Sequence, residues 1–566
     1  MLKKSILVFL KSNLSLIVLL IFGVISWSLT MVKSGLCWNA QCASGVGFWG
    51  ANGHDGIWHL ALINNLSKGI FDMPVFAGYT LQNYHIGFDL LVAMLHRLTG
   101  ISINTLYFQI LPPIFTLLIG LFVYWFIENW RKSKKEAVWA VFFTYFAGSF
   151  GWVLGKGESA FWSQQAITSL INPPFALSLI FILLGLIFLL KFLKNHSTYY
   201  FLLSTVFFGL LIEIKVYAGL LVLGALFVSA VHELITVHPA LPAGRRLRIT
   251  FVFLGSLTIS LILFFSLTRI SGSSLVWQPF WFLETMMGIS DRLGWTRFYS
   301  AMMTYKSGGI LLKGTLAYLV AFVIFVVGNF GTRILAFKNI NLKKLSSIDL
   351  FIWSIITGGI LIPTFFLQKG TPWNTIQFFY YSLFFSGILA GIVLSRTTYY
   401  ILLATVLLTI PTTIITLKDV YLPQRPPAIL PKEELSALEF LRNQPDGVVL
   451  TYPFDRIKAK EAEASPPRPL YLYESTAYVS AFSGKSTFLE DEVNLNITGY
   501  DWPTRRVDIE NWYKEPNEVK ARKFLKKNSI KYIYWVKPQR AYLGEGQLGL
   551  IRLFENLKVD IWMVGD

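Results

Sequence analysis

The chain has 566 residues, of which 54% are hydrophobic and only 14% are charged, and its mean hydropathy is +0.53. A soluble protein of several domains is not this apolar, so the composition predicts an integral membrane protein. Most of the net charge of +18 lies before residue 418, with 28 Lys and Arg against 11 Asp and Glu, whereas the remainder has 22 against 21. Because the expected soluble part is nearly neutral, nucleic acid is excluded as an expected partner.

The N-terminal segment is basic and is followed by an apolar run that ends at Thr30. No small-residue cleavage site follows convincingly, so we interpret the run as a retained first span. Cys37 and Cys42 come directly after it. They can form a small disulfide loop if this segment faces an oxidising compartment, and the alternative is two unpaired thiols.

The first loop, 33–105, has a helical pattern of its own. Apolar residues at helical spacing predict one short helix from Ile57 to Leu66 and a second from Ile86 to Leu98, ending at Gly100. Both are amphipathic, so we expect two helices that lie on the membrane surface.

Apolar runs long enough to cross a bilayer, about 17–25 residues each, number about eleven. They are 14–32, 106–128, 137–155, 175–193, 199–214, 217–235, 249–268, 312–331, 349–367, 374–395 and 399–417. The alternative for 199–214 and 217–235 is a single helix broken near Glu213 and Lys215.

Basic residues predict the orientation of these spans, because cytoplasmic segments are enriched in Lys and Arg. The short segments between alternate spans are net basic and are therefore assigned to the cytoplasm, together with the N-terminus. Their basic residues are Lys3, Lys4, Lys11, Arg131, Lys132, Lys134, Lys135, Lys191, Lys194, Arg245, Arg246, Arg248, Arg333, Lys338, Lys343, Lys344 and Arg396. The intervening loops and the C-terminus are then expected outside.

A Pro-rich segment, 418–431, separates the expected transmembrane domain, 1–417, from a soluble domain, 432–566. In the soluble domain we expect helices and strands to alternate, which indicates a small α/β domain. The expected elements are a helix over Lys432–Asn443, a strand over Val448–Tyr452, an extended stretch over Leu470–Ser480, a helix over Pro516–Asn528, and strands over Ile530–Val536 and Val559–Val564. The fold class is thus a polytopic α-helical membrane protein, N-in and C-out, with a small C-terminal α/β domain.

Asp55 is the main candidate for chemistry. It follows a Gly-rich stretch and stands between His54 and His59, where the chain enters a helix. A carboxylate in this place can take a proton from an acceptor hydroxyl as a general base. It can also simply cap the helix, and with His59 it can form part of a metal site, although two ligands are a weak signal.

The order of these features resembles the GT-C superfamily of membrane glycosyltransferases, which use polyprenyl-phosphate-linked sugars. The resemblance covers the whole chain as architecture, and its motifs are HDGIWH at 54–59 and NYHIGFDLL at 83–91. The segments AYVSAFSGKSTFLEDE at 477–492 and FLKKNSIKYIYW at 524–535 are similar to the outer domains of such enzymes. By this resemblance Asp55 is the catalytic base, and His54, His59, Tyr84 and His85 contact the substrates.

Related enzymes often supply a second acidic residue from the next outer loop, and here Glu158 is the only candidate. The alternative is a solvated loop residue. No DxD motif occurs, which leaves the need for a divalent metal open, and no cofactor is certain.

A lipid phosphate needs fixed cations near the outer surface. The candidates are Lys215, Arg292, Arg297 and Lys369. Lys215 has the alternative of pairing with Glu213 or snorkelling to the interface. Arg292 and Arg297 flank an aromatic segment that is either a loop helix over the active cavity or only a membrane anchor.

Glu490, Asp491 and Glu492 form an acidic cluster near Tyr500 and Trp502. Aromatic rings beside carboxylates are usual in sugar-binding surfaces, and the alternative is a solvated acidic face.

The sequence therefore predicts an inverting glycosyltransferase of the cytoplasmic membrane. It would move a sugar from a polyprenyl-phosphate donor to an acceptor glycan, lipid or protein on the outer face, with the C-terminal domain extracytoplasmic. The alternatives are a multi-pass transporter or lipid flippase and a GT-C-derived scaffold without activity. Apart from Glu213, Lys215 and Glu233, the spans lack the buried ionisable residues that a transporter would need.

Overall fold

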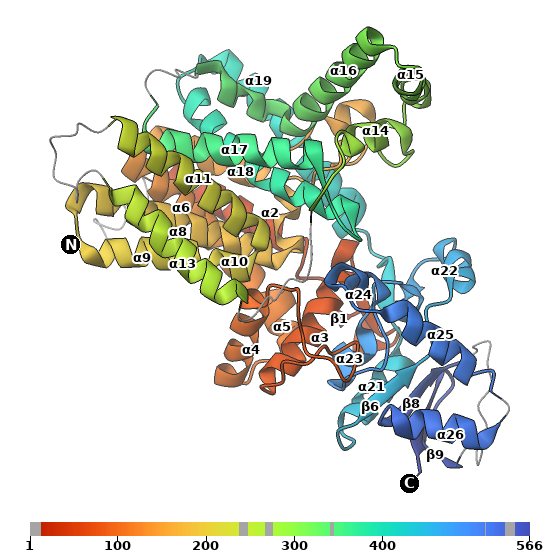
Figure 1. Ribbon diagram of the computed structural model, residues 1–566. Helices are drawn as coiled ribbons and strands as arrows, with labels where there is room; N and C mark the ends of the chain where they lie inside the picture. Colours follow the sequence, from red (N-terminus) through yellow and green to blue (C-terminus); the bar gives the residue numbers. More distant parts are fainter. Residues whose placement is uncertain are drawn as a thin grey trace. The chain divides into compact units, whose positions relative to one another are not determined.

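A computed structural model describes residues 13–236, 247–265, 275–339, 345–515, 517–537 and 549–565. The chain divides into two compact units, which Figure 1 shows as ribbons. The helical unit contains Met1–Leu29 and Pro112–Asp419, and the mixed unit contains Thr30–Leu111 and Val420–Asp566. Seven of the basic residues used to predict orientation lie outside the described residues: Lys3, Lys4, Lys11, Arg245, Arg246, Lys343 and Lys344.

Among its described residues, the helical unit consists of helices and one two-stranded ribbon, β3 (Leu275–Trp277) with β4 (Phe366–Gln368). Its helices are α2 (Leu14–Ser28), α6 (Leu111–Arg131), α7 (Lys134–Phe146), α8 (Pro173–Asn195), α9 (Thr198–Gly209), α10 (Leu211–Ile214), α11 (Val216–Thr236), α13 (Arg248–Leu263), α14 (Trp281–Gly288), α15 (Thr296–Ser307), α16 (Leu311–Phe330), α17 (Ser347–Phe365), α18 (Gln377–Leu394), α19 (Tyr399–Thr409) and α20 (Pro411–Thr416).

Helix α18 is the centre of this unit. Its apolar segment is 83% buried, against 22% for the segment that contains α16. Glycines allow the neighbouring helices to approach closely: a Cβ on Gly391 would lie 2.5 Å from the backbone nitrogen of Ala140 in α7, and one on Gly359 in α17 would lie 2.5 Å from the carbonyl oxygen of Phe378. Close approach without a side chain maximises dispersion contacts, which are the main packing force between helices in lipid.

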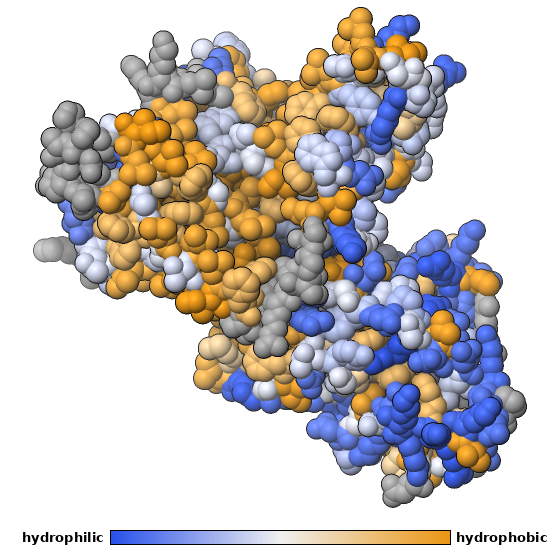
Figure 2. Space-filling model, in the orientation of Figure 1, coloured by the Kyte–Doolittle hydropathy of each residue, from blue (hydrophilic) through white to orange (hydrophobic). Residues whose placement is uncertain are grey.

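The outer helices of this unit expose apolar side chains, among them Phe227, Ile235, Ile262 and Leu316. Figure 2 shows hydrophobic residues over most of the visible surface of α8, α9, α11 and α13. An apolar surface of this extent is stable only in a bilayer. The chain is therefore a multi-pass membrane protein.

Seven helices among the described residues are long and apolar enough to cross a membrane, and three shorter apolar helices cover Leu14–Ser28, Thr198–Ile214 and Arg248–Leu263. Ten of the eleven predicted spans overlap one of these ten helices. The remaining predicted span, 137–155, overlaps α7, which ends at Phe146 and is followed by a short 3₁₀ helix over Gly151–Leu154. The number of spans and their orientation stay predictions.

The chain breaks between α10 and α11 at Lys215, whose backbone is extended, with φ −159° and ψ 108°. Helix α9 packs against α8 and α13, whereas α11 packs against α13 and α17. Both helices contact α13, but the main further neighbour is α8 for α9 and α17 for α11, as expected for two helices rather than one.

The mixed unit has a four-stranded sheet with the order β6-β8-β10-β9. Strands β6 (Val448–Thr451) and β8 (Ile530–Val536) are parallel, and β10 (Val559–Val564) pairs antiparallel with β8 and with β9 (Leu550–Glu555). The helices of this unit are α3 (Asp55–Ser67), α4 (Gly87–Thr99), α5 (Ile103–Thr105), α21 (Lys432–Arg442), α22 (Arg456–Glu463), α23 (Tyr478–Ser483), α24 (Glu492–Thr498), α25 (Trp502–Trp512) and α26 (Glu518–Lys527).

A second small sheet joins the first loop to the C-terminal part. In it, β1 (Leu36–Cys37) and β2 (Val46–Phe48) come from the loop, and β5 (Ala428–Leu430) and β7 (Arg468–Pro469) come from the C-terminal part. Lys33 Nζ also donates hydrogen bonds to the carbonyl oxygens of Tyr421 and Pro423, at 3.2 and 3.0 Å. The Pro-rich segment is therefore held against the loop, and backbone pairing makes the loop part of the same folded body.

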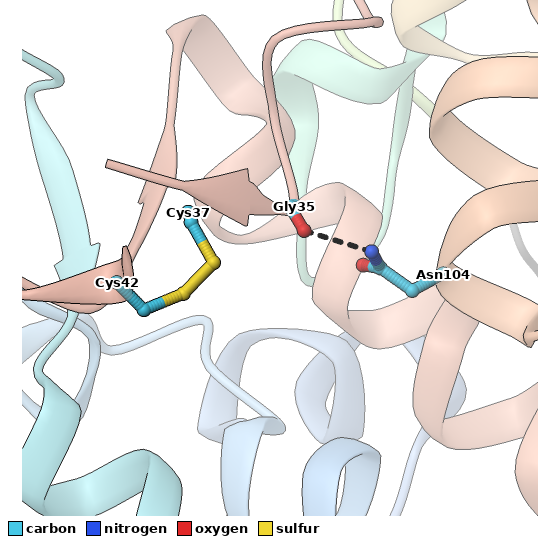
Figure 3. The surroundings of a disulfide bond; sticks show 4 residues. All are labelled: Gly35, Cys37, Cys42 and Asn104. Carbon is cyan, nitrogen blue, oxygen red and sulfur yellow. Dashed lines mark hydrogen bonds between the residues drawn. A yellow bond between two sulfur atoms is a disulfide. The ribbon is translucent and has the colours of Figure 1, made fainter. Parts of the chain in front are cut away.

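Cys37 and Cys42 are joined by a disulfide at the end of β1 (Figure 3). Beside it, the Asn104 side chain donates a hydrogen bond of 2.8 Å to the carbonyl oxygen of Gly35. Of the two alternatives considered for the cysteines, the structure has the disulfide loop.

The two helices predicted in the first loop are present as α3 and α4, and α4 ends at Gly100 with φ +70°, a conformation that favours glycine. The surface location expected for the first helix is wrong, because α3 is buried on nearly all sides. It packs against α4 and α23. Helix α4 does expose apolar residues, including Met94 and Leu98.

In the C-terminal part, the predicted helices correspond to α21 and α26, and the predicted strands to β6, β8 and β10. The extended stretch expected over Leu470–Ser480 is wrong, because the chain forms a 3₁₀ turn over Leu470–Leu472 and then enters α23 at Tyr478. Its alternating apolar residues are buried by tertiary contacts instead of by strand pairing.

Candidate functional site

Asp55 is the first residue of α3, and His54 occupies the N-cap position without making a capping hydrogen bond through its side chain. The His54 Nδ1 and Asp55 Oδ1 atoms lie 2.7 Å apart. The Asp55 side chain is 56% exposed. Because the residue lies inside the helix, the interpretation of Asp55 as the N-cap loses its geometric basis. Its carboxylate still benefits from the positive end of the helix dipole.

Asp491 belongs to the same group of side chains. It is buried at the N-terminus of α24, where its carboxylate accepts hydrogen bonds from the backbone and side-chain nitrogens of Asn494, at 3.0 and 2.8 Å. Burial raises the pKa of Asp491 to about 7; Asn494 opposes this rise and the Asp55 carboxylate adds to it. Asp491 and Asp55 are therefore close enough to interact, although more than 400 residues separate them in sequence.

The pKa of His54 is raised above its usual value. Burial lowers this pKa, but the hydrogen-bonded Asp55 carboxylate and the charge of Asp491 raise it by more. The His54 ring also stacks on Tyr473, with 6.3 Å between ring centroids. The imidazole is thus oriented by its hydrogen bond to Asp55 and by the Tyr473 ring, and it can keep or share the proton that Asp55 would accept.

His59 has a different partner from Asp55. Its Nδ1 atom lies 2.7 Å from Oδ1 of Asp89, and both residues are buried. Tyr84, Phe88 and Tyr107 surround the imidazole, with centroids 5.6–6.4 Å away. This buried pair joins α3 to α4. Asp89 was missed as a candidate, although it lies within the quoted motif NYHIGFDLL, at the start of the helix.

Tyr84 and His85 lie next to this pair. Their rings stack with centroids 4.7 Å apart, and Tyr84 meets Trp58 edge to face. His85 is buried, whereas Tyr84 is partly exposed. The HDGIWH and NYHIGFDLL motifs are thus in contact, but the structure separates Asp55 and His59 into two hydrogen-bonded pairs.

Within the described ranges, no group of three or more His, Cys, Asp and Glu residues is placed to hold a metal ion. Asp55 and His59 each hydrogen-bond to another side chain. Each of them thus belongs to a separate carboxylate–imidazole pair, Asp55 with His54 and His59 with Asp89.

The acidic cluster is buried. Glu490 accepts hydrogen bonds of 3.0 Å from the backbone nitrogens of Val479 and Ser480, and Glu492 forms an ion pair with Arg506. Burial raises the pKa of Glu490 to about 8, although these backbone donors oppose the rise. A solvated acidic face is therefore the wrong interpretation of these residues.

Glu158 lies in the loop between α7 and α8 of the helical unit. The residue is partly buried, and burial raises its pKa to about 8, against the opposing effects of the Thr168 hydroxyl and the Gln165 backbone. A fully solvated side chain would not show this shift.

Arg292 packs on the same loop. Its guanidinium lies 4.3 Å from the centroid of the Trp162 ring and forms an ion pair of 3.1 Å with Asp291. The aromatic segment expected to form one loop helix forms two, α14 and α15, and Arg297 is exposed on α15. Arg292 thus contacts the loop that carries Glu158, through the Trp162 ring.

Lys215 is buried, and its Nζ atom donates a hydrogen bond of 3.2 Å to Asn172. Two residues later, the Tyr217 hydroxyl donates a bond of 2.6 Å to Gln368, which precedes the exposed Lys369. Lys215 and Lys369 therefore belong to segments in direct contact. A burial of this kind does not fit a lysine that snorkels to the interface.

The sequence predicts Arg333 in a short basic cytoplasmic segment, and the structure buries its side chain. Its guanidinium donates to Gln165 at 2.8 Å and to the carbonyl oxygen of Ala147 at 2.7 Å. The positive-inside rule counts charges in the loops between spans. Because the Arg333 guanidinium is packed inside the unit, it does not count as evidence for the predicted orientation of the spans.

No protein-family model matches the chain, and no curated protein matches it by sequence. Two solved structures of the oligosaccharyltransferase of Archaeoglobus fulgidus are similar to it. The apo form has a TM-score of 0.51 at 14% identity, covering 92% of this chain and 69% of that one. The form tethered through a disulfide to an acceptor peptide containing the NVT sequon has a TM-score of 0.50 at 14% identity, covering 93% and 70%. The resemblance predicted from the sequence is thereby confirmed at the level of the fold, which is similar to that of this oligosaccharyltransferase.

Proposed function

We propose that the protein is a glycosyltransferase that moves a sugar from a polyprenyl-phosphate-linked donor to an acceptor at the outer face of the cytoplasmic membrane. The observation that carries this proposal is the Asp55–His54 pair, a partly exposed carboxylate at a helix N-terminus, in a chain with an oligosaccharyltransferase-like fold. The disulfide between Cys37 and Cys42 supports an oxidising location for the same loop.

In the proposed reaction, an acceptor hydroxyl attacks the anomeric carbon in line with the departing phosphate. A new carbon–oxygen bond forms, the bond to the phosphate oxygen breaks, and its electron pair leaves with the lipid phosphate, so the anomeric centre is inverted. Asp55 takes the hydroxyl proton as general base. His54 orients the carboxylate and can share the proton through their 2.7 Å hydrogen bond.

The leaving phosphate develops charge that fixed cations can stabilise. We assign this role to Lys215, Arg292, Arg297 and Lys369 of the helical unit. Glu158 would be the second acidic residue, and with a pKa of about 8 it is mostly protonated at neutral pH. It would then act as a hydrogen-bond donor to a phosphate oxygen.

The test is transfer by the purified full-length protein from a panel of radiolabelled polyprenyl-phosphate sugars. Loss of a general base slows a reaction by about 10²–10⁴-fold, so we expect Asp55→Asn to lower the transfer rate by at least about 100-fold. Asp72→Asn, which changes an exposed carboxylate of the same loop, is the matched control and should keep the wild-type rate.

Full activity of Asp55→Asn would disprove the assigned mechanism. Absence of transfer by the wild-type protein from every donor would instead favour a transporter or an inactive scaffold.

A further inference from the structure

The mixed unit contains a cavity of about 50 Å³ at the carboxyl ends of the parallel strands β6 and β8. A single water needs about 10–15 Å³ of such a volume, so the cavity has room for several polar groups. In sheets with parallel strands, the carboxyl ends of the strands are the usual place for a ligand. The walls of this cavity also include residues of the segments 471–478 and 489–492.

Two kinds of side chain dominate the wall. Among the described residues of the wall, five tyrosines contribute aromatic rings, five acidic residues contribute carboxyl groups, and Lys458 is the only Lys or Arg. Aromatic faces carry partial negative charge and accept the polarised C–H groups of a sugar ring, while carboxylates accept hydrogen bonds from hydroxyl groups. This combination fits a ligand with an apolar face and several hydroxyls.

Two polar atoms of the wall point to a missing partner. Thr476 and Glu492 are both more than nine-tenths buried, and within the described residues neither the Thr476 Oγ1 atom nor the Glu492 Oε2 atom has a hydrogen-bond partner. The other oxygen of Glu492 pairs with Arg506. A buried polar atom without a partner costs about 1–3 kcal/mol. A ligand that supplied both a donor and an acceptor here would remove this cost.

The charge state of the wall favours a neutral ligand over a cation. The pKa of Glu490 is raised to about 8 and that of Asp491 to about 7 by burial, so near neutral pH these groups are largely protonated or close to it. Protonated carboxyls donate as well as accept. The charge of Glu492 is already compensated by its ion pair with Arg506, and Nη2 of Arg456 lies 3.5 Å from Oε1 of Glu474.

The cavity is next to Asp55. Tyr473 forms part of its wall and stacks on His54, and Asp491 forms part of its wall and interacts electrostatically with both His54 and Asp55. A sugar ring held in the cavity would therefore contact residues that themselves interact with the proposed base and its histidine.

We propose that this cavity binds a neutral saccharide and that this saccharide is the acceptor of the transfer. The second half of the proposal rests on the proposed function, whereas the first half does not. Thr476 and Glu492 would hydrogen-bond to the sugar hydroxyls, and the tyrosines would hold the face of the ring.

The binding test uses saturation-transfer NMR on the full-length protein in detergent, with methyl β-glucoside, methyl β-galactoside, methyl α-mannoside and N-acetylglucosamine as probes, and glucosamine and glucuronate as charged comparisons. We expect binding of at least one neutral sugar, with weaker binding of the charged ones. Preference for glucosamine, preference for an NVT-containing peptide over every sugar, or no sugar binding at 100 mM would overturn the proposal.

The variant is Thr476→Val, which keeps the shape and removes only the hydroxyl. We expect the affinity for the sugar to fall about five- to tenfold, the effect of one hydrogen bond of roughly 1 kcal/mol. Glu474→Gln, at a partly exposed wall position, should also weaken binding. Thr205→Val is the control, since its hydroxyl is likewise buried without a partner among the described residues, but in the helical unit. Unchanged affinity in both wall variants would contradict the proposal.

Kinetics separate the two proposals. If both hold, Thr476→Val raises the KM for the acceptor sugar by the same factor and leaves kcat unchanged. Sugar binding that depends on Thr476 without any transfer would retain the cavity assignment and reject the enzymatic one. Transfer with an unchanged acceptor KM would reject the cavity as the acceptor site.

Discussion

At the scale of single residues, the buried acids of the mixed unit have the largest energetic consequences. Glu434 in α21 is fully buried, and burial raises its pKa from 4.5 to about 8, although the Tyr478 hydroxyl and Lys558 oppose the rise. Burial also raises the pKa values of Glu490 and Asp491. In the native state these groups hold protons that the unfolded chain releases at lower pH. Their contribution to stability is therefore present below about pH 4.5 and is lost as the pH rises towards 8.

Glu434→Gln should flatten this dependence. A group that is protonated in the native state and ionised in the unfolded state changes the free energy of unfolding by about 1.4 kcal/mol per pH unit. We expect the variant to lose stability between pH 4.5 and 8 less steeply than the wild type, by up to that amount. The measurement is denaturant unfolding of the full chain in detergent at a series of pH values. Glu439→Gln, an exposed position of the same helix, should follow the wild type, and an equal slope in both variants would refute the effect.

At the scale of elements, the contact between the first loop and the C-terminal part depends on the pairing of β2 with β5. Gly45 immediately precedes β2, with φ +96°, and a Cβ there would lie 2.1 Å from the carbonyl oxygen of Leu430. Both the backbone conformation and the space thus exclude a side chain. This pairing keeps β2, and through it the start of α3, next to the C-terminal part.

Gly45→Ala should separate these two effects when compared with Gly78→Ala. Gly78 also has a positive φ of +87°, but a Cβ there would meet nothing within 4 Å. The strained φ costs about 1–2 kcal/mol in either variant. The clash with Leu430 should add roughly 1–3 kcal/mol in Gly45→Ala only. Thermal unfolding and limited proteolysis of the loop report the difference. Equal destabilisation by the two substitutions would show that the strands can separate without cost.

At the scale of the whole molecule, the division into a helical and a mixed unit has a consequence for topology. The first loop and the C-terminal part share the sheet β1-β2-β5-β7, so they must lie on the same side of the membrane. An even number of crossings must then separate Leu111 from Val420. The positive-inside rule predicts that this side faces away from the cytoplasm.

Cysteine labelling in intact cells tests this topology, because the native cysteines are paired and do not react. We expect a membrane-impermeant maleimide to label Asp72→Cys and Leu557→Cys, both at exposed positions, and to label Lys135→Cys only after permeabilisation. Opposite behaviour of Asp72→Cys and Leu557→Cys would contradict the shared sheet. Labelling of both only after permeabilisation would reverse the predicted orientation.

Local patterns in the sequence determined much of this protein. Long apolar runs can be stable only as spans, and strong periodicity predicted α3, α4, α21, α26 and the strands β6, β8 and β10. Asp55 was found because a carboxylate after a glycine-rich turn, between two histidines, is unusual, and because the motif matches a known family. These features depend on neighbours within a few residues, so the sequence displays them directly.

Only the tertiary structure decided which distant side chains meet. Nothing local in the sequence indicates that Asp491 lies near Asp55, that Asp89 pairs with His59, or that Arg333 is buried. The pattern at 470–480 favours an extended chain, yet burial against neighbouring elements makes a turn and a helix there. Long-range packing, and the desolvation of charges that it causes, depends on the whole fold, and that is why the cavity beside Asp55 emerged only in three dimensions.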